Sequence, residues 1–414
     1  MQAEIVSIGT EILLGDIVDS NSKYLANKLT ENGYDIHHIS TVGDNKKRLV
    51  EVIKTAIKRS DLVITTGGLG PTDDDLTREA IADATNKELY LDEKLLNRIK
   101  EYFNKKGYSM TKNNNKQAYL PKGADYIKND WGTARGLFLE TKNCTIISLP
   151  GVPGEMKNIF SNYVLDKITS NDEIIISKTL NFFGIGESTL ETKLKDILEK
   201  QANPTLALLA GKGEVKLRIT AKGKDKSDIM NKINEQENVI KNRVGQYIYG
   251  INNSNLAKEV FKKLIKNNLK ISFAESCTGG LISHRLTENS GSSKIFKGSL
   301  VTYSNSSKKN LLNIKDKDLK QYGAVSEKIA KDMATNVKNI FNTDIGVGVT
   351  GIAGPTGGSR EKPVGLVYIG ISFKEKTKVY KLNLNGSRSF NKWMSSQYLY
   401  FYLLRILRRG YNEI

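Results

Sequence analysis

Apolar strand-like segments alternate with amphipathic helical segments through the first 170 residues, and this alternation constrains the fold more than any other feature. The patterns predict strands at residues 4–9, 35–41, 61–68 and 144–150, and helices at 22–33 and 48–60. Such alternation favours an open, mostly parallel sheet in an α/β fold. Ligands of these sheets bind beyond the carboxyl ends of the strands, so we expect a site there.

Two further domains are predicted after residue 170. Residues 171–252 carry the patterns of a small α+β module, and residues 253–414 form another α/β unit that ends in an aromatic helix. An Asn-rich stretch, 251–255, separates them, and we expect Ser254 to cap the helix that follows. The predicted domains are therefore 1–170, 171–252 and 253–414.

Composition narrows the class of protein. Hydrophobic residues make up 39% and charged residues 26% of the chain, as in a soluble globular protein. The first residues lack the pattern of a secretory signal, and no apolar run reaches the length of a membrane span. The two cysteines, Cys144 and Cys277, fall in different predicted domains, which argues against a disulfide framework. We expect a cytoplasmic protein with no membrane partner.

The formal charge of +18 is concentrated at one end of the chain. Residues 253–414 hold 27 Lys and Arg against 11 Asp and Glu, a net +16. This excess predicts an anionic ligand, either a phosphorylated small molecule or a nucleic acid. A solvated, lysine-rich surface accounts for it equally well, because many of these lysines fall on the polar faces of predicted helices.

Two glycine-containing segments follow predicted strands in the C-terminal domain. The first, AESCTGG at 274–280, lies between a strand and a helix, where free backbone N–H groups favour an anion or a developing oxyanion. Simple helix capping, with Gly279 and Gly280 allowing close packing, is the alternative. The second, TGIAGPTGG at 350–358, offers a backbone that can surround a phosphate or carboxylate.

A group that could activate a nucleophile is found in a third segment. His284 follows Ser276 by eight positions, roughly 12 Å along a helix axis, and is too far away. The segment VTYSNSSK at 301–308 supplies Tyr303 and Lys308, followed by Lys309. A desolvated lysine can act as a neutral base, and a tyrosine can relay its proton.

These three segments, with GAVSE at 323–327 and KPVG at 362–365, resemble the CinA family, and the resemblance covers essentially the whole chain. The family's C-terminal domain also occurs alone as a nicotinamide mononucleotide deamidase. The resemblance implies Ser276 as nucleophile, with Tyr303 and Lys308 activating it and Cys277 as a chemical competitor. The reaction gives nicotinate mononucleotide and ammonia without a cofactor. The implied substrate-binding residues are Thr278, Gly279, Gly280, Gly351, Ala353 and Gly354.

A second candidate site lies in the N-terminal domain. Gly67, Gly68 and Gly70 follow a predicted strand, and Asp73, Asp74 and Asp75 come just before a predicted helix. Helix capping by Asp and oxygen ligands for a divalent metal that carries a phosphate are both consistent with this run. Further polar residues follow other predicted strands or open the helix after the aspartates: Thr10, Glu11, Asp19, Asn21, Thr77 and Glu155.

The N-terminal pattern resembles the molybdopterin-binding domain in the form fused within CinA proteins. Cofactor-biosynthesis members carry Thr after the paired glycines, whereas this chain has Leu69, the CinA form. Several CinA proteins act as metal-dependent ADP-ribose pyrophosphatases. The resemblance therefore implies ADP-ribose as a ligand, and Asp74 and Asp75 as the family pair that holds a divalent metal of unknown identity.

Binding without catalysis is the competing hypothesis, because the family name refers to competence and DNA damage and the middle module resembles a KH fold. RNA-binding KH domains clamp the backbone with a GxxG loop, and the glycines of residues 171–252 never fall three apart. We therefore expect small nucleotides rather than nucleic acid as ligands, and a spacer or dimer element in this module. A homodimer is the expected assembly.

Overall fold

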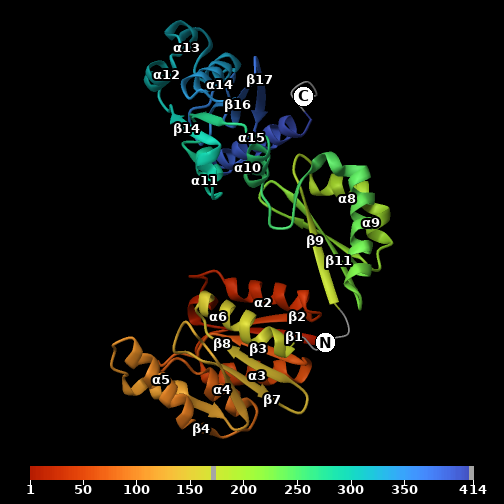
Figure 1. Ribbon diagram of the computed structural model, residues 1–414, viewed down its shortest axis with the longest axis vertical. Helices are drawn as coiled ribbons and strands as arrows, with labels where there is room; N and C mark the ends of the chain where they lie inside the picture. The colour runs from red at the N-terminus through yellow and green to blue at the C-terminus, as the bar shows by residue number, and fades with distance from the viewer. Residues whose placement is uncertain (169–173, 410–414) are drawn as a thin grey trace. The chain divides into compact units, whose positions relative to one another are not determined.

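The computed structural model describes residues 1–168 and 174–409, so the predicted boundary between residues 170 and 171 lies outside the described residues. The chain divides into two compact units. One comprises Met1–Ser177 with Thr220–Ile233, and the other Lys178–Ile219 with Asn234–Ile414. Figure 1 shows the course of the chain through its helices and strands.

The N-terminal domain contains a six-stranded sheet in the order β2-β1-β3-β8-β7-β6. Four neighbouring strands are parallel: β1 (Gln2–Ile8), β2 (Asp35–Val42), β3 (Leu62–Thr66) and β8 (Thr145–Leu149). Two antiparallel strands, β7 (Gly136–Glu140) and β6 (Ala124–Ile127), extend the sheet at one edge. The predicted open, mostly parallel sheet is confirmed.

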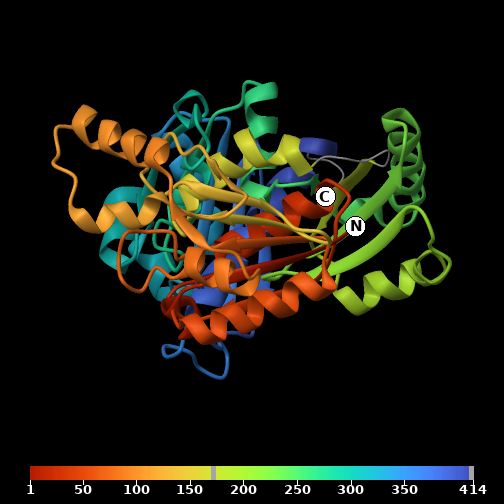
Figure 2. The same ribbon diagram turned by 90° about the horizontal axis from the view of Figure 1, so that it is seen from below.

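Helices cover both faces of this sheet (Figure 1). Helices α2 (Ser20–Glu31) and α6 (Pro153–Ile159) contribute to one apolar core, and α3 (Lys46–Arg59), α4 (Thr77–Ala84) and α5 (Glu93–Lys105) to the other. All five residues of β3 are buried, as expected for a strand covered on both faces. In Figure 2, the orange segment that contains α5 projects from one end of the domain.

Short elements complete the N-terminal domain. They are α1 (Thr10–Leu13), β4 (Leu89–Leu91), the 3₁₀ helix η1 (Lys112–Ala118), β5 (Tyr119–Pro121), the π-helical turn η2 (Phe160–Val164) and α7 (Leu165–Ile168). Strands β4 and β5 form an antiparallel pair of their own.

The middle module is a four-stranded sheet in the order β10-β11-β9-β12 with two helices. Its elements are β9 (Ile174–Phe182), α8 (Glu187–Glu199), β10 (Thr205–Ala210), β11 (Val215–Gly223), α9 (Lys226–Val244), the 3₁₀ turn η3 (Gly245–Tyr247) and β12 (Ile248–Ile251). Strand β12 was not predicted, and it pairs antiparallel with β9. The predicted small α+β module is confirmed.

The C-terminal domain has a five-stranded sheet in the order β14-β13-β15-β16-β17. Strands β13 (Ile271–Glu275), β14 (Phe296–Val301) and β15 (Ile345–Gly351) are parallel, whereas β16 (Leu366–Phe373) and β17 (Lys376–Asn383) continue the sheet antiparallel. The helices and the remaining turn are α10 (Leu256–Lys266), α11 (Leu281–Thr287), η4 (Ser292–Lys294), α12 (Asn305–Leu312), α13 (Asp316–Tyr322), α14 (Glu327–Ile340) and α15 (Arg388–Arg409).

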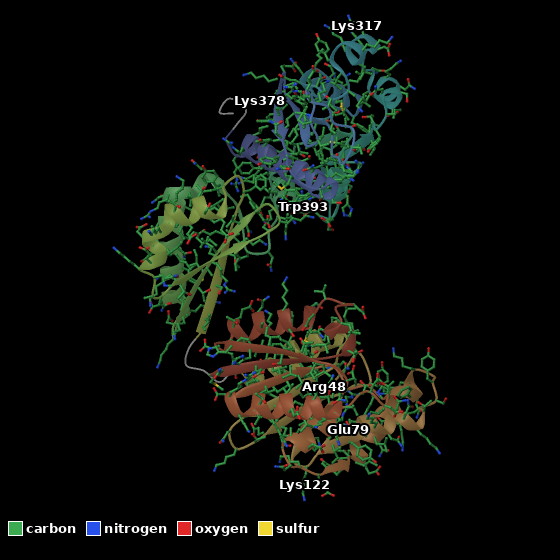
Figure 3. The ribbon with its side chains drawn as sticks, turned by 180° about the vertical axis from the view of Figure 1, so that it is seen from behind. Arg48, Glu79, Lys122, Lys317, Lys378 and Trp393 are labelled. Carbon is green, nitrogen blue, oxygen red and sulfur yellow. The ribbon has the colours of Figure 1, made fainter. Side chains whose placement is uncertain are left out.

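Close packing in this domain depends on glycines in the sheet. A Cβ atom on Gly348 or Gly370 would lie 2.6 or 2.3 Å from the carbonyl oxygen of Ala330, so α14 can approach the sheet only because both side chains are missing. Helices α10, α11 and α15 share a large apolar core with the sheet. Trp393 of α15, labelled in Figure 3, donates its indole N–H to the carbonyl of Lys212, 3.1 Å away on the turn between β10 and β11.

One detail of the linker differs from the prediction. Helix α10 is capped by Asn255, whose side chain accepts the N–H of Lys258, and not by Ser254, whose hydroxyl bonds Glu259. Both residue types cap helices well, so the sequence alone did not separate them. Within residues 1–168 and 174–409, no helix combines the length and the apolar character needed to cross a membrane.

Candidate functional site

Ser276 and Lys308 lie together in a pocket at the carboxyl end of the C-terminal sheet. Ser276 immediately follows β13, and Lys308 projects from α12, which follows the neighbouring strand β14. The Nζ atom of Lys308 is 3.0 Å from Ser276 Oγ, and the Lys308 side chain is only 1% exposed. The two residues that the sequence singled out therefore form a buried hydroxyl–amine pair.

The surroundings of Lys308 allow its amine to be neutral. Burial lowers the pKa of Lys308, and the neighbouring Cys277 opposes this shift. The amine also donates to the carbonyl oxygens of Thr302 at 2.8 Å and Tyr303 at 3.4 Å. A neutral amine has two N–H groups for these carbonyls, which leaves its lone pair for the hydroxyl of Ser276.

Cys277 is a poor competitor for the nucleophile role. Its side chain is 6% exposed, and burial raises the pKa of the thiol to about 12. The thiol is therefore protonated at neutral pH, and the thiolate is the reactive form of cysteine.

The expected free N–H groups at the start of α11 are a wrong prediction, because the carboxylate of Glu275 takes them. Glu275 is fully buried and accepts from the backbone N–H groups of Gly280, Ile282 and Ser283 at 2.9–3.2 Å. It also accepts the Thr278 hydroxyl at 2.8 Å. An internal anion thus occupies the positive end of this helix.

The predicted substrate-binding residues separate into two groups. Gly351, Ala353 and Gly354 line the pocket with Ser276 and Lys308. Thr278, Gly279 and Gly280 do not line it, and they instead form the turn around Glu275. The pocket measures about 250 Å³, and its other lining residues are Cys277, Tyr303, Asn305, Ala324, Val325, Thr350, Ile352, Thr356, Gly357 and Arg388.

Arg388, at the start of α15, is a lining residue that the sequence analysis missed. Its guanidinium donates to the carbonyl of Gly354 at 2.7 Å and to the hydroxyl of Tyr303 at 2.6 Å. Tyr303 is 58% exposed, so its hydroxyl faces the rim of the pocket, and its carbonyl is the group that contacts Lys308. His284 has a largely exposed side chain 3.8 Å from Glu288, in agreement with its exclusion as a base.

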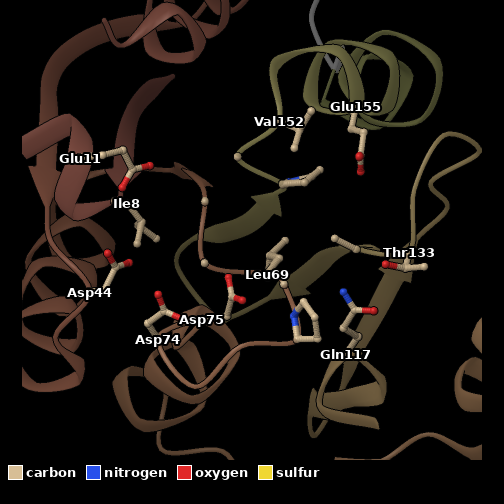
Figure 4. Close-up of a pocket in the computed structure, with 18 residues that line it drawn as sticks. Ile8, Glu11, Asp44, Leu69, Asp74, Asp75, Gln117, Thr133, Val152 and Glu155 are labelled. Atoms are coloured by element: carbon tan, nitrogen blue, oxygen red, sulfur yellow. The ribbon is translucent and has the colours of Figure 1, made fainter. Parts of the chain in front are cut away.

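A second pocket, of about 510 Å³, lies at the carboxyl ends of the parallel strands of the N-terminal sheet (Figure 4). Figure 4 shows Glu11, Asp44, Asp74 and Asp75 on one side of this pocket, and Gln117, Thr133 and Glu155 on the other. The remaining lining residues are Ile8, Gly9, Gly67, Gly68, Leu69, Gly70, Pro71, Ala134, Pro150, Gly151 and Val152.

The glycine loop of this pocket is held tightly against the sheet. Gly67 and Gly68 have positive φ angles, and a Cβ atom would lie 2.1 Å from the Ile8 carbonyl oxygen or 2.3 Å from Thr77 Oγ1, respectively. The buried hydroxyl of Thr77 donates to the carbonyl of Gly67 at 2.9 Å. Thr77 therefore supports the loop from behind and does not line the pocket.

The aspartates do not cap the following helix. Helix α4 starts at Thr77, and its N-cap residue, Leu76, makes no side-chain cap bond. Asp75 instead accepts from the backbone N–H of Thr72 at 2.9 Å and from its hydroxyl at 2.5 Å. Interaction with Thr72 also lowers the pKa of the exposed Asp74 carboxyl. Both carboxylates line the pocket, whereas Asp73 does not.

Only some of the other residues predicted for the N-terminal site line the pocket. Glu11 and Glu155 line the pocket. Asp19 caps α2 by accepting the N–H of Ser22, and buried Asn21 donates to Thr66 and to the Gly151 carbonyl, so these two support neighbouring segments.

Thr10 also plays a supporting part, by donating to Asp44, a lining residue that the sequence analysis missed. Across residues 1–168 and 174–409, no three His, Cys, Asp or Glu side chains gather closely enough to hold a metal by themselves.

Comparison with protein families covers nearly the whole chain. The CinA C-terminal domain matches residues 253–407, a probable molybdopterin binding domain matches residues 4–170, and the damage-inducible protein CinA KH domain matches residues 177–250. The positions of the predicted domain limits stay a prediction.

Two relatives match over nearly the whole of this chain. A protein of Halothermothrix orenii, whose name refers to competence damage, is 54% identical over 414 residues and 100% of both chains. A CinA-like protein of Dictyoglomus thermophilum is 48% identical over 94% of this chain and 95% of its own. A crystal structure of CinA from Thermoplasma acidophilum covers 40% of this chain and 98% of its own, at 36% identity and a TM-score of 0.38. The full-length identities and the three domain matches show that this chain belongs to the CinA family.

Proposed function

We propose that the C-terminal pocket hydrolyses the amide of nicotinamide mononucleotide, giving nicotinate mononucleotide and ammonia. The observation that carries this proposal is the 3.0 Å separation between Ser276 Oγ and the buried amine of Lys308. A serine beside a lysine of lowered pKa is a known arrangement for nucleophilic attack on a carbonyl carbon. The reaction uses no metal and no redox cofactor.

The reaction proceeds through an ester of Ser276. Oγ bonds to the amide carbon while its proton passes to Lys308, and the carbonyl electrons move to oxygen. The carbon–nitrogen bond then breaks, and the lysine ammonium returns the proton to the departing nitrogen, which leaves as ammonia. Water next attacks the ester carbon through the same base, and the proton it gives up restores the Ser276 hydroxyl.

A phosphorylated substrate suits the charge around this pocket. Arg388 places a guanidinium at the rim, beside the glycine-containing segment that carries Gly354. The residues from 253 onward hold a net charge of +16, which attracts anions to this domain. The proposed substrate would therefore place its amide at Ser276 and its phosphate nearer the rim of the pocket.

The test is release of ammonia from nicotinamide mononucleotide by the full-length chain. Ser276→Ala should abolish release, because no ester can form, whereas Cys277→Ala should keep most activity. Ser290→Ala, an exposed serine of the same domain, is the matched control. Loss in Cys277→Ala with retention in Ser276→Ala would assign the nucleophile to the thiol.

A second activity, metal-dependent hydrolysis of the pyrophosphate of ADP-ribose, is proposed for the N-terminal pocket. The observation that favours it is the gathering of Glu11, Asp44, Asp74 and Asp75 on one side of that pocket. These carboxylates would repel a pyrophosphate unless a cation lay between them. The two proposed activities thus use chemically separate sites.

The residues present fit a hard divalent cation. Magnesium is held in many proteins by one or two carboxylates, with phosphate oxygens and waters completing its shell, so a third protein ligand is not required. Asp74 and Asp75 are the proposed ligands, and Thr72 fixes the orientation of Asp75. When bound, the metal neutralises phosphate charge and polarises the bond to be cleaved.

A further inference from the structure

Gln117 stands out among the residues that line the N-terminal pocket. It lies in the 3₁₀ helix η1, and its side chain is only 1% exposed. Within the described part of the chain, neither its Nε2 nor its Oε1 atom has a hydrogen-bond partner. Figure 4 shows its amide end turned toward the pocket on the side of Leu69 and Thr133.

An unpaired buried amide is costly to the folded protein, because it loses hydrogen bonds to water and gains none. Both neighbours of Gln117 are held in place: the side-chain amine of Lys116 donates to the carbonyl of Thr72 at 2.9 Å, and the carbonyl of Ala118 accepts the backbone N–H of Asp92 at 3.0 Å. Burial confines the amide of Gln117, and its donor group and its acceptor group are both unused. Such a pair of groups is matched by a ligand that presents an acceptor beside a donor.

The walls near Gln117 suit a flat ring. Figure 4 shows apolar Leu69 beside Gln117, and Pro71 and Ala134 are further uncharged residues of the pocket lining. The carboxylates proposed to hold the metal lie on the other side of the same pocket (Figure 4). A ligand that spans the pocket would thus place its phosphates near the aspartates and a ring near Gln117.

We propose that Gln117 reads the edge of an adenine-type base, in which an exocyclic amine donor lies next to a ring nitrogen acceptor. Bidentate pairing of a glutamine amide with this edge is a standard mode of adenine recognition. This assignment rests on the pyrophosphatase activity proposed above, which sets the orientation of the ligand in the pocket. It adds a base-recognition subsite to that pocket. A purine without the exocyclic amine leaves Oε1 of Gln117 unpaired.

The experiment compares two diphosphates, ADP and the 5′-diphosphate of unsubstituted purine riboside, by calorimetric titration of the full-length chain with magnesium present. The wild-type chain should bind ADP at least about 10-fold more tightly, because the purine analogue leaves a buried acceptor unpaired. Gln117→Met keeps the length of the side chain and removes both polar groups. It should bring the ratio of the two dissociation constants to within about 2-fold.

Thermal unfolding without ligand separates recognition from a structural role. If the amide is unpaired in the free protein, Gln117→Met should unfold at the same temperature as wild type or higher, because it removes two unsatisfied polar atoms. Gln117→Leu serves as a second apolar variant should the first fail to fold. Asn104→Ala, an exposed amide on α5, is the control and should change neither the ratio nor the melting temperature.

The outcomes of base recognition and catalysis are distinguishable. A ratio that falls in Gln117→Met supports the subsite even if ADP-ribose is not hydrolysed by any variant. An unchanged ratio overturns the subsite, even if ADP-ribose hydrolysis proceeds normally. Equal binding of the two diphosphates by the wild-type chain overturns it as well.

Discussion

Arg388 donates a hydrogen bond of 2.6 Å to the hydroxyl of Tyr303. This contact places the tyrosine hydroxyl in a different part of the pocket from the amine of Lys308. Lys308 contacts Ser276 directly, whereas the Tyr303 hydroxyl lies at the exposed rim and holds the guanidinium that also bonds Gly354. A proton relay through Tyr303, which the sequence had suggested, is therefore unnecessary for removing the proton of Ser276. A role in shaping the entrance to the pocket fits the contacts better.

Tyr303→Phe should weaken substrate binding more than it slows the chemical step. Without the hydroxyl, Arg388 keeps its bond to Gly354 and loses one of its two partners. We expect KM for nicotinamide mononucleotide to rise about 3- to 10-fold, with kcat changed less than about 3-fold, as for loss of one hydrogen bond to a charged group. Steady-state kinetics measure both constants. A fall of 100-fold in kcat with unchanged KM would restore the relay.

The rate of deamidation should rise with pH until Lys308 is neutral. Below the pKa of Lys308 the amine is protonated and cannot accept the proton of Ser276. Because burial lowers this pKa, the rise in kcat/KM should be complete at a pH below that needed to neutralise an ordinary lysine of pKa 10.5. A pH profile of kcat/KM between pH 5 and about 10 measures the midpoint.

Substitution of Lys308 tests the same assignment. Lys308→Met should lower turnover at least about 100-fold, as expected for the loss of the general base, and Lys308→Arg should be equally inactive because guanidinium keeps its proton. Lys309→Met is the matched control, since Lys309 is exposed and paired with Asp316.

Since burial disfavours the Lys308 ammonium, the folded state binds fewer protons there than the unfolded state. Stability should therefore rise with pH through the Lys308 pKa in wild type and not in Lys308→Met.

Glu275→Gln should destabilise the turn that presents Ser276. The carboxylate accepts three backbone N–H groups and the hydroxyls of Thr278 and Ser283, and an amide cannot accept all of these bonds with its NH₂ group. We expect a loss of about 2–4 kcal/mol in the free energy of unfolding, measured by chemical denaturation. Glu288→Gln, an exposed carboxylate at the end of α11, should have little effect. Equal stability of both variants would contradict this account.

Much of the fold could be predicted because burial leaves a direct mark on the sequence. The five buried residues of β3 form an uninterrupted strand pattern, and the apolar residues of α3, including Leu49 and Ile53, recur at helical spacing. Strand β12 escaped prediction because four residues beside a linker carry too little pattern. The pair Ser276 and Lys308 was found because each lies in a short segment typical of the family and follows a predicted strand.

Other site residues could not be predicted, because their roles depend on contacts between distant segments. Arg388 reaches Tyr303 across 85 positions, and nothing near Arg388 in the sequence marks it. The helix start at Gly280 looked available to a ligand, since only the folded chain shows that Glu275 turns back onto it. Gln117 was missed for the same reason: an amide becomes informative only when its burial and its unpaired atoms are known.

Removal of metal should separate the two proposed activities. Asp44, Asp74 and Asp75 lie on one side of the N-terminal pocket, and a pyrophosphate there needs a bound metal to offset the repulsion of their carboxylates. The pair of Ser276 and Lys308 needs no metal, because its base is an amine. EDTA should therefore abolish hydrolysis of ADP-ribose and leave the release of ammonia from nicotinamide mononucleotide unchanged. Both substrates are assayed on one preparation, with and without the chelator.

Substitution of the aspartates should give the same separation. Asp74→Asn and Asp75→Asn each remove one proposed ligand charge at nearly constant size, so each should lower ADP-ribose hydrolysis at least about 100-fold while deamidation persists. Asp166→Asn, a carboxylate of the same domain outside the pocket lining, is the control for a general effect of lost charge. Deamidation that fails in EDTA would show that the C-terminal pocket also depends on a metal. Hydrolysis of ADP-ribose that survives both substitutions would remove Asp74 and Asp75 from the metal site and leave Glu11 and Asp44 as the remaining carboxylates on that side of the pocket.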